Sequence, residues 1–313
     1  MIDRRLLLAG AGAATLSACA EPFDTAGGRK KPQGGIGGTG IVGTLTDFGS
    51  VLVNGLRLEV SADTLITNAF GLARERDLAI GQQLTIEAAD GRARRIHIAY
   101  PVIGTVAEGA TRDEGVVAGV PVTLETGALG ALIPGARVAV SGVWRGPRVV
   151  ASRIDILPGP GPDVIACEYM NKGPEGVPAI GGRRLASLPG SAPANLSYVT
   201  ATGKNTDDGF VVQHLREGRF TGAAGPLVEL SVEGYLRPDP NPPFRSVSGL
   251  GHSFHEGSRL AWFKENRVLF SGGYEGTFVA EEGLLLPEQF AARRTLLADV
   301  LAGKDVGERL AAR

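Results

Sequence analysis

The stretch GGIGGTGIVGTLTDFGSVLVNG, residues 34–55, decides the fold of this chain. Its first half contains G-x-G-x-x-G, the spacing of a dinucleotide-binding loop, at Gly35, Gly37 and Gly40. That fingerprint needs a strand before the first glycine and a helix after the last, because the helix N-terminus faces the pyrophosphate. Here Lys-Lys-Pro-Gln comes before the glycines, and a strand-like run follows them. We therefore expect no dinucleotide and no other cofactor.

The second half of the stretch predicts a β-hairpin. Asn54-Gly55 separates two apolar-alternating runs, and this dipeptide suits a two-residue turn with positive φ at both positions. Further strand patterns follow Gly81 and the turn at Asp90-Gly91, up to Ile98. About five short strands in roughly sixty residues are typical of a small closed barrel.

The same layout recurs directly afterwards. Gly43-Thr44-Leu45 is matched by Gly104-Thr105-Val106, and the hairpin at Asn54-Gly55 is matched by Ala118-Gly119. An internal repeat of this kind indicates tandem copies of one unit. We predict a first barrel over residues 36–100 and a second over residues 101–157.

The second half of the chain is harder to divide. Pro and Gly alternate over residues 158–162, which neither a ladder nor a helix tolerates, so we expect a linker over residues 158–194. Strand-like runs then return, and Leu230–Gly234 is similar to Val138–Gly142 of the second copy. This similarity predicts a third, divergent β domain over residues 195–282.

Residues 283–313 have a different pattern. Pro287 opens a segment in which apolar residues recur near the helical period, and Gly303 supplies a stop signal. The predicted fold class is therefore all-β, with tandem small OB-like β-barrels and a short C-terminal α-helix.

Residues 1–19, MIDRRLLLAGAGAATLSAC, have the pattern of a bacterial lipoprotein signal peptide. Arg4 and Arg5 come before a short apolar run, and small residues come before Cys19, the predicted site of lipidation. Residues 20–35 look like a flexible tether. We expect export and a membrane anchor facing the periplasm. Ala20 favours the outer membrane, because Asp at that position is typical of inner-membrane retention.

Composition narrows the range of partners. The formal net charge of the 313 residues is −1 and aromatic residues make up 6%. The chain therefore lacks the basic excess and the stacking rings that nucleic-acid binders usually have. Lipidation of Cys19 would leave Cys167 as the other cysteine, which we expect to be a small buried residue.

The glycine-rich entry, Phe48-Gly49-Ser50 and Val53-Asn54-Gly55, in this order, resemble bacterial exported proteins with the domain of unknown function numbered 5666. The likeness covers residues 36–99 and, in a degraded form, 101–157. It implies small OB-like barrels repeated on secreted or lipid-anchored chains. It implies no catalytic residues.

Candidate sites are few. Of the four histidines, His252 and His255 are the only closely spaced pair, and with Glu256 they would serve a metal-dependent hydrolase if a turn brought them together. Exposed rings such as Trp144, Tyr235 or Trp262 would instead suit an OB-type binder of oligosaccharide or nucleic acid.

Our leading hypothesis is a non-catalytic binding or scaffold module on a lipid-anchored envelope protein. Its expected partners are the membrane, through the lipid, and an envelope protein or a glycan. Nucleic acid is disfavoured as a partner.

Overall fold

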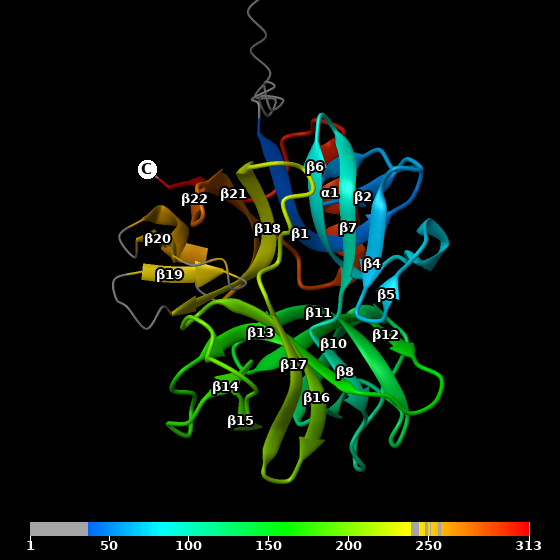
Figure 1. Ribbon diagram of the computed structural model, residues 1–313. Coiled ribbons are helices and arrows are strands. Elements are labelled where there is room, and N and C mark those ends of the chain that lie inside the picture. Colours follow the sequence, from blue (N-terminus) through cyan, green and yellow to red (C-terminus); the bar gives the residue numbers. More distant parts are fainter. Residues whose placement is uncertain are drawn as a thin grey trace, which may run out of the picture.

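A computed structural model describes residues 37–238, 244–247, 250, 252–255, 258–263 and 265–312 of the chain. The predicted signal peptide, Cys19 and the predicted tether lie outside these residues. In the described part, strands predominate and one α-helix, α1 (Phe290–Leu301), lies near the C-terminal end. The all-β prediction with a short C-terminal helix is therefore confirmed (Figure 1).

The first unit is a closed barrel. Its strands are β1 (Gly38–Asp47), β2 (Val51–Val53), β3 (Leu56–Leu58), β4 (Leu65–Asn68), β5 (Gly71–Leu72), β6 (Gln83–Ala89) and β7 (Arg92–Ala99). β1 pairs with β2 and β6, β2 pairs with β3, and β6 pairs with β7. A parallel ladder between β4 and β7 and a parallel bridge from Glu59 to Arg92 complete the circuit. A short 3₁₀ turn at Glu75–Asp77 leads into β6.

The second unit repeats this circuit. Its strands are β8 (Val102–Thr105), β9 (Glu114–Val117), β10 (Val120–Leu129), β11 (Arg137–Arg145) and β12 (Arg148–Ile156). They pair in the order β8, β9, β10, β12, β11 and back to β8, and β10 runs parallel to β12. These strands all lie within residues 101–157, where the sequence predicts the second barrel.

A third unit follows the proline-glycine run. Its strands are β13 (Asp163–Met170), β14 (Ala179–Ile180), β15 (Arg183–Ser187), β16 (Tyr198–Thr206) and β17 (Gly209–Glu217). Strand pairings close the circuit β13, β14, β15, β17, β16 and back to β13, again with the third and fifth strands parallel. Cys167 on β13 is 3% exposed, as expected for a small buried residue.

The remaining strands form a fourth unit with the same order. They are β18 (Leu227–Pro238), β19 (Phe244–Val247), β20 (His252–His255), β21 (Arg267–Tyr274) and β22 (Phe278–Leu285). β18 pairs with β19 and β21, β19 with β20, and β21 with β22, while β20 lies against β22. A 3₁₀ turn at Arg259–Phe263 links β20 to β21, and β23 (Arg309–Ala311) extends the sheet beyond β22.

These four units correct the predicted division of the second half. Residues 158–194 are not a linker, because they contain β13, β14 and β15; the strand-free connection is the short proline-glycine run alone. Residues 195–282 are not one domain, because β16 and β17 complete the third unit and β18 begins the fourth. The similarity of Leu230–Gly234 to Val138–Gly142 was misleading, since the former lies on a first strand and the latter on a fourth strand.

The helix also starts later than predicted. Gln289 is the N-cap of α1, so Pro287 lies two residues before the cap and not in the first turn. Gly303 follows the C-cap residue Ala302 with a φ of +76°, which is the stop signal expected of glycine at this position. The helix is therefore confined to the middle of residues 283–313.

The same turn connects the second and third strands of the first three units. Asn54-Gly55, Ala118-Gly119 and Gly181-Gly182 all have positive φ at both residues, between 48° and 83°. This is the geometry of a primed two-residue turn, whose twist matches that of the strands. The predicted hairpin at Asn54-Gly55 is confirmed, and its counterparts locate the repeat in the third unit.

A β-bulge also recurs at one place in all four units, on the last strand, where it faces the strand before it. The last strand carries one extra residue, namely Arg94, Ser152, Gln213 or Glu281, opposite the pairs Glu87/Ala88, Ser141/Gly142, Thr202/Gly203 and Ser271/Gly272. A bulge bends its strand and increases the local twist. Its recurrence indicates that each small barrel turns its corner in the same way.

The units associate in two pairs through their first strands. β1 runs parallel to β18, which joins the first and fourth units into one sheet of 13 strands. β8 runs antiparallel to β13, which joins the second and third units into a sheet of 10 strands. In Figure 1 the first pair forms the upper half of the molecule and the second pair, in green, the lower half.

Asn54 connects the first unit to the fourth through buried hydrogen bonds. We expect Asn54→Ala to lower the free energy of unfolding by about 1–3 kcal/mol. Urea denaturation measures this loss. Its buried Nδ2 donates to the carbonyl oxygens of Val42 and Ser231, both at 3.1 Å, and lies 3.2 Å from Ser231 Oγ. The variant leaves these buried acceptors without this donor.

Asp90→Ala is the matched control, because Asp90 also has positive φ in a two-residue turn but is exposed. If both variants lose the same stability, turn strain and not the lost hydrogen bonds explains the effect, and the proposed tie is wrong.

Candidate functional site

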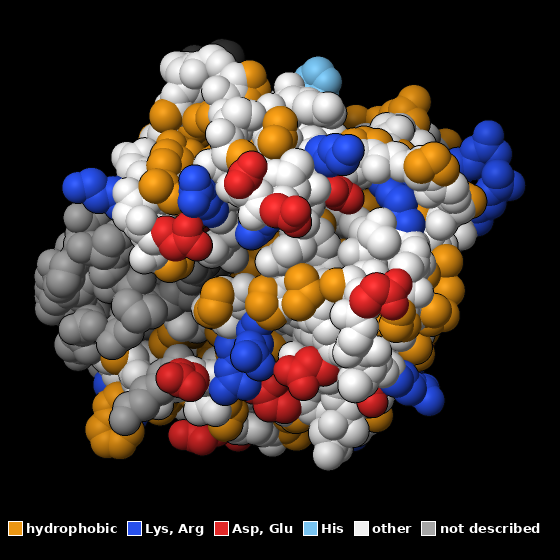
Figure 2. Space-filling view, turned by 90° about the horizontal axis from the view of Figure 1, so that it is seen from below, with side chains coloured by type: hydrophobic (Ala, Val, Ile, Leu, Met, Phe, Trp, Pro, Cys, Tyr) orange, Lys and Arg blue, Asp and Glu red, His pale blue; other side chains and the backbone are white. Residues whose placement is uncertain are grey.

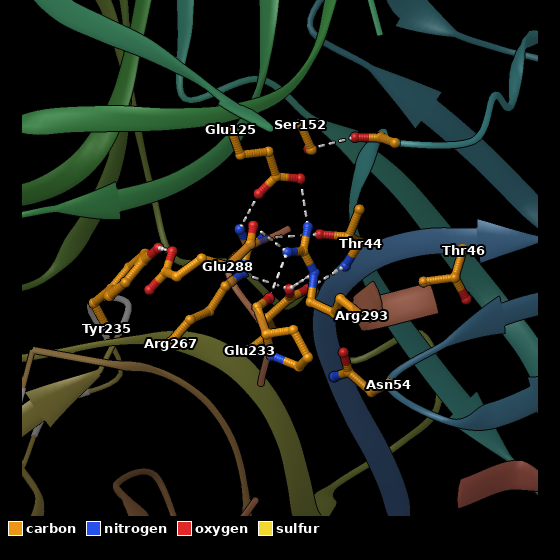
Figure 3. A network of polar contacts seen from close by, with 12 residues as sticks. Thr44, Thr46, Asn54, Glu125, Ser152, Glu233, Tyr235, Arg267, Glu288 and Arg293 are labelled. Carbon is orange, nitrogen blue, oxygen red and sulfur yellow. Dashed lines mark hydrogen bonds and ion pairs between the residues drawn. The ribbon is translucent and has the colours of Figure 1, made fainter. Parts of the chain in front are cut away.

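Two carboxylates and two guanidinium groups meet at the centre of the molecule, closed off from solvent (Figure 3). The side chains of Glu233, Arg267 and Arg293 have no exposed surface, and that of Glu125 is 2% exposed. Buried charges are costly unless they are paired and hydrogen-bonded. Here the formal charges of the four groups sum to zero.

Each carboxylate contacts both guanidinium groups. Arg267 places Nη1 2.5 Å from Glu125 Oε2 and Nε 2.8 Å from Glu233 Oε1. Arg293 places Nη2 2.5 Å from Glu125 Oε1 and Nε 3.1 Å from Glu233 Oε1. The result is a closed circuit of alternating charge, which we call the central charge cluster.

The cluster draws its members from three units and from the helix. Glu125 lies on β10 of the second unit, and Arg293 lies on α1. Glu233 on β18 and Arg267 at the start of β21 belong to the fourth unit. The backbone N–H of Thr44, on β1 of the first unit, donates to Glu233 Oε2 at 2.7 Å. The cluster therefore fixes these elements relative to one another.

The protonation states of the cluster follow from this pairing. Burial raises the pKa of Glu233, but Arg267 and Arg293 lower it more, so the net pKa lies below its ordinary value. Burial lowers the pKa of Arg267, but Glu233 and Glu125 raise it more, so its net pKa is raised. Each of these two shifts favours the charged form of its group, as expected for oppositely charged groups paired in a buried site.

Tyr235 lies at the edge of the central charge cluster. The sequence suggested an exposed ligand-binding ring at this position, but the ring is buried. It is 2% exposed, and its hydroxyl donates to Glu288 Oε2 at 2.5 Å. Burial raises the pKa of Tyr235. Arg293 Nη1 donates to the carbonyl oxygen of Glu288 at 3.3 Å, so the same short segment contacts both side chains.

The other two predicted rings differ in their exposure to solvent. Trp144 is 8% exposed and its indole N–H donates to the carbonyl oxygen of Ala166 at 2.8 Å, so it joins the second and third units and is not a ligand-binding surface. Trp262 is 80% exposed on the 3₁₀ turn of the fourth unit. Of the three rings that the sequence offered as exposed ligand-binding candidates, only Trp262 is exposed.

The predicted metal ligands lie at the limit of what the structure describes. His252 and His255 are the first and last residues of β20, and Glu256 lies outside the described residues. Among the described residues, no group of three His, Cys, Asp or Glu side chains is placed to hold a metal ion. The metal site stays a prediction of the sequence.

Open grooves between the units offer space for a ligand. The groove between the second and third units has a volume of about 820 Å³. Its walls carry hydroxyl, amide and charged groups, among them Thr105, Asp163, Thr202, Lys204 and His214. Burial raises the pKa of Asp163, whose carboxylate accepts the backbone N–H of Asn205 at 2.8 Å. We call this the polar groove.

A second groove separates the third unit from the fourth and has a volume of about 700 Å³. Three of its lining residues are aromatic, namely Tyr198, Phe220 and Tyr274. Both volumes lie within the range of about 300–1,000 Å³ that is usual for small-ligand sites. We call this second one the aromatic groove.

Surface charge is mixed where it can be seen. On the face shown in Figure 2, Lys and Arg side chains alternate with Asp and Glu, and no broad patch of a single sign forms among the described residues. Binding of nucleic acid through its phosphates normally needs a continuous basic surface. This face does not supply one.

His97 on β7 is a half-buried base with cationic neighbours. Its Nδ1 lies 2.9 Å from Thr67 Oγ1. Burial lowers the pKa of His97 from 6.5 to about 3, and the charges of Arg216, Arg95 and Arg219 act in the same direction. His97 therefore takes up a proton near pH 6.5 in the unfolded chain, but only near pH 3 in the folded chain. This contribution to stability is complete above pH 6.5 and is lost as the pH falls.

We expect His97→Gln to flatten the pH dependence of stability. For each pH unit below 6.5, the wild type should lose about 1.4 kcal/mol through this group. Urea unfolding at pH 7.5 and at pH 5.5 measures the loss, and the variant should show a loss smaller by about that amount. His214→Gln is the control, because His214 is exposed and its removal should leave the loss unchanged. An unchanged pH dependence in His97→Gln would contradict the assignment.

No protein-family profile, curated protein or solved structure matches this chain. None of the residues that the structure describes forms a helix with the length and apolarity needed to cross a bilayer.

Proposed function

We propose that this chain is a lipid-anchored envelope protein with a non-catalytic binding or scaffold role on the periplasmic side. The anchor is inferred from the N-terminal pattern of Arg4, Arg5 and a small-residue run before Cys19. The binding role is inferred from the repeat of small barrels and from the grooves between them.

The central charge cluster is the observation that carries the binding or scaffold role. Its charges are closed off from solvent, so they act on the chain's own segments and not on a substrate. By fixing β1, β10, β18, β21 and α1 relative to one another, the cluster holds the surfaces between units in one arrangement. A pre-arranged surface loses less conformational freedom when it binds a partner.

The anchor is tested by Cys19→Ser in the full chain expressed in a bacterial host. We expect the wild type to sediment with membranes and to resist high salt but not detergent. The variant should leave the membrane pellet, since a protein without the lipid has lost about 0.8 kcal/mol of membrane affinity for every CH₂ group of the chain.

Cys167→Ser is the matched control for this experiment, because it removes the other cysteine without touching the predicted signal. It should stay in the membrane pellet. Membrane association that persists in Cys19→Ser, or a wild type found in the soluble fraction, would overturn the anchored half of the proposal.

A further inference from the structure

The aromatic groove lies where the third and fourth units meet. The third unit contributes the loop before β16 and the end of β17, and the fourth contributes the turn between β21 and β22. This place is distinct from the face formed by the second and third strands of a barrel, which OB-type binders use. The groove therefore exists only because two units pack side by side.

The rings in the groove are held in fixed positions. Phe220 and Tyr274 form an edge-to-face pair with ring centroids 6.2 Å apart and an interplanar angle of 65°. Both rings are partly exposed and pack against the core of the fourth unit. On the other side, the Arg219 guanidinium lies 3.7 Å from the centre of the Tyr198 ring. Packing thus orders flat groups at the groove wall before any ligand arrives.

Hydrogen-bonding groups surround these rings. Glu217 and Asn195 are exposed side chains on the third-unit side, and Thr277 is an exposed side chain on the fourth-unit side. Together with Arg219 they supply a carboxylate, an amide, a hydroxyl and a guanidinium. The formal charges of Glu217 and Arg219 cancel. The groove therefore offers many donors and acceptors without a net charge.

We propose that the aromatic groove binds an oligosaccharide; this inference rests on the binding role proposed above. A sugar ring has an apolar face of C–H groups, which packs on an aromatic ring, and a rim of hydroxyls, which pairs with carboxylate, amide and guanidinium groups. Phe220 and Tyr274 supply the first kind of contact and Glu217 the second. The volume of about 700 Å³ accommodates more than one sugar unit.

Single-stranded nucleic acid is the rival ligand, because bases also stack on aromatic rings. Two observations favour the sugar. Glu217 would face the phosphates at the mouth of the groove, and the chain as a whole carries a formal charge of −1. Binding of single strands relies on a positively charged groove that follows the backbone.

The test is saturation-transfer NMR on the full chain with three tetrasaccharides as probes: chitotetraose, cellotetraose and tetragalacturonate. The oligonucleotide dT8 and a tetra-alanine peptide are measured in parallel. We expect saturation transfer to the C–H protons of at least one tetrasaccharide, little affected by salt because the groove has no net charge. Neither dT8 nor the peptide should compete with it.

Variants then locate the site. Tyr274→Ala should weaken the binding of the sugar roughly tenfold or more through the lost ring contact. Because Tyr274 also packs on the core, Tyr274→Phe is the second variant; it keeps the ring and should stay close to wild type. Glu217→Ala changes an exposed side chain and should weaken binding about threefold to tenfold without affecting the fold.

Two controls lie outside the groove. Trp262→Ala removes the most exposed tryptophan, and Gln213→Ala changes an exposed residue of the polar groove. Both should bind like the wild type. The proposal is overturned if no tetrasaccharide binds, if dT8 or the peptide displaces the sugar, or if the controls weaken binding as much as Tyr274→Ala. A negative result in this sugar-binding test does not change the expected fractionation of Cys19→Ser. The sugar-binding proposal and the membrane-anchor proposal can therefore be rejected independently.

Discussion

Arg267→Met should lower the free energy of unfolding by about 3–5 kcal/mol, since it removes one partner from a buried ion network. In the wild type, Arg267 contacts both Glu125 and Glu233. The variant leaves these two carboxylates with Arg293 as the remaining cation of the cluster, and thus with an uncompensated buried negative charge. Urea denaturation followed by circular dichroism measures the loss as a lower midpoint.

Arg92→Met is the matched control for this prediction. Arg92 also pairs with a glutamate, Glu59 at 2.9 Å, but both side chains are more than 60% exposed. An exposed pair of this kind contributes at most about 1 kcal/mol. If Arg267→Met is no more harmful than Arg92→Met, the central charge cluster does not hold the units together, and the scaffold argument loses its main support.

Gly203→Ala should cost about 3 kcal/mol of unfolding free energy, at the upper end of what overpacking usually costs. Gly203 on β16 lies opposite the recurring bulge of β17, and a Cβ there would overlap the carbonyl oxygen of Val211 on β17. Because that oxygen belongs to the main chain of a neighbouring strand, a change of rotamer cannot relieve the overlap. Thermal and urea unfolding of the purified variant measure the loss.

The first unit supplies the control. Ala88 occupies the position opposite its bulge, so Ala88→Gly creates no overlap and should cost only about 0.5–1 kcal/mol through backbone entropy. Gly142 and Gly272 should behave like Gly203, because a Cβ at either one also meets a main-chain oxygen of the fifth strand. Equal losses in Ala88→Gly and Gly203→Ala would show that the bulge does not require glycine.

Turn chemistry made the first two barrels predictable from sequence. Asn54-Gly55 and Asp90-Gly91 adopt the positive φ that such dipeptides favour, and Ala118-Gly119 preserved enough of the pattern to be matched. The third unit was missed because one of its signals changed residue type. Leu196, just before the fourth strand of the third unit, has a φ of +67°. The first two units have glycine at the equivalent position. A search for glycine therefore overlooks this turn.

The strand β13 could not be predicted from the sequence for a different reason. Its residues between Val164 and Tyr169 are all buried, because β13 pairs with a neighbour on each side and both its faces are covered. A strand covered on both faces lacks the alternation of apolar and polar residues that marks a half-exposed strand. The surrounding glycines and prolines then made the segment look like a linker.

The central charge cluster could not have been read from the sequence. Glu125, Glu233, Arg267 and Arg293 lie far apart along the chain, and each looks like an ordinary surface charge. Charged residues are almost never fully buried unless they are paired, so only the packing of three units against α1 reveals the partners. The aromatic groove was missed in the same way, since its rings come from two units whose boundaries had been misplaced.

The parallel pairing of β1 with β18 has a consequence for the order of folding. Residues 38–42 of the first strand form a ladder with residues 227–232, so one edge of the first barrel stays open until nearly three quarters of the chain is available. Closing such a long loop is slow, and an open strand edge invites association with other chains. The first barrel can close through its own strands, but the first half of β1 keeps an unpaired outer edge until β18 is made, so the newly made chain is most prone to aggregation just before its fourth unit forms.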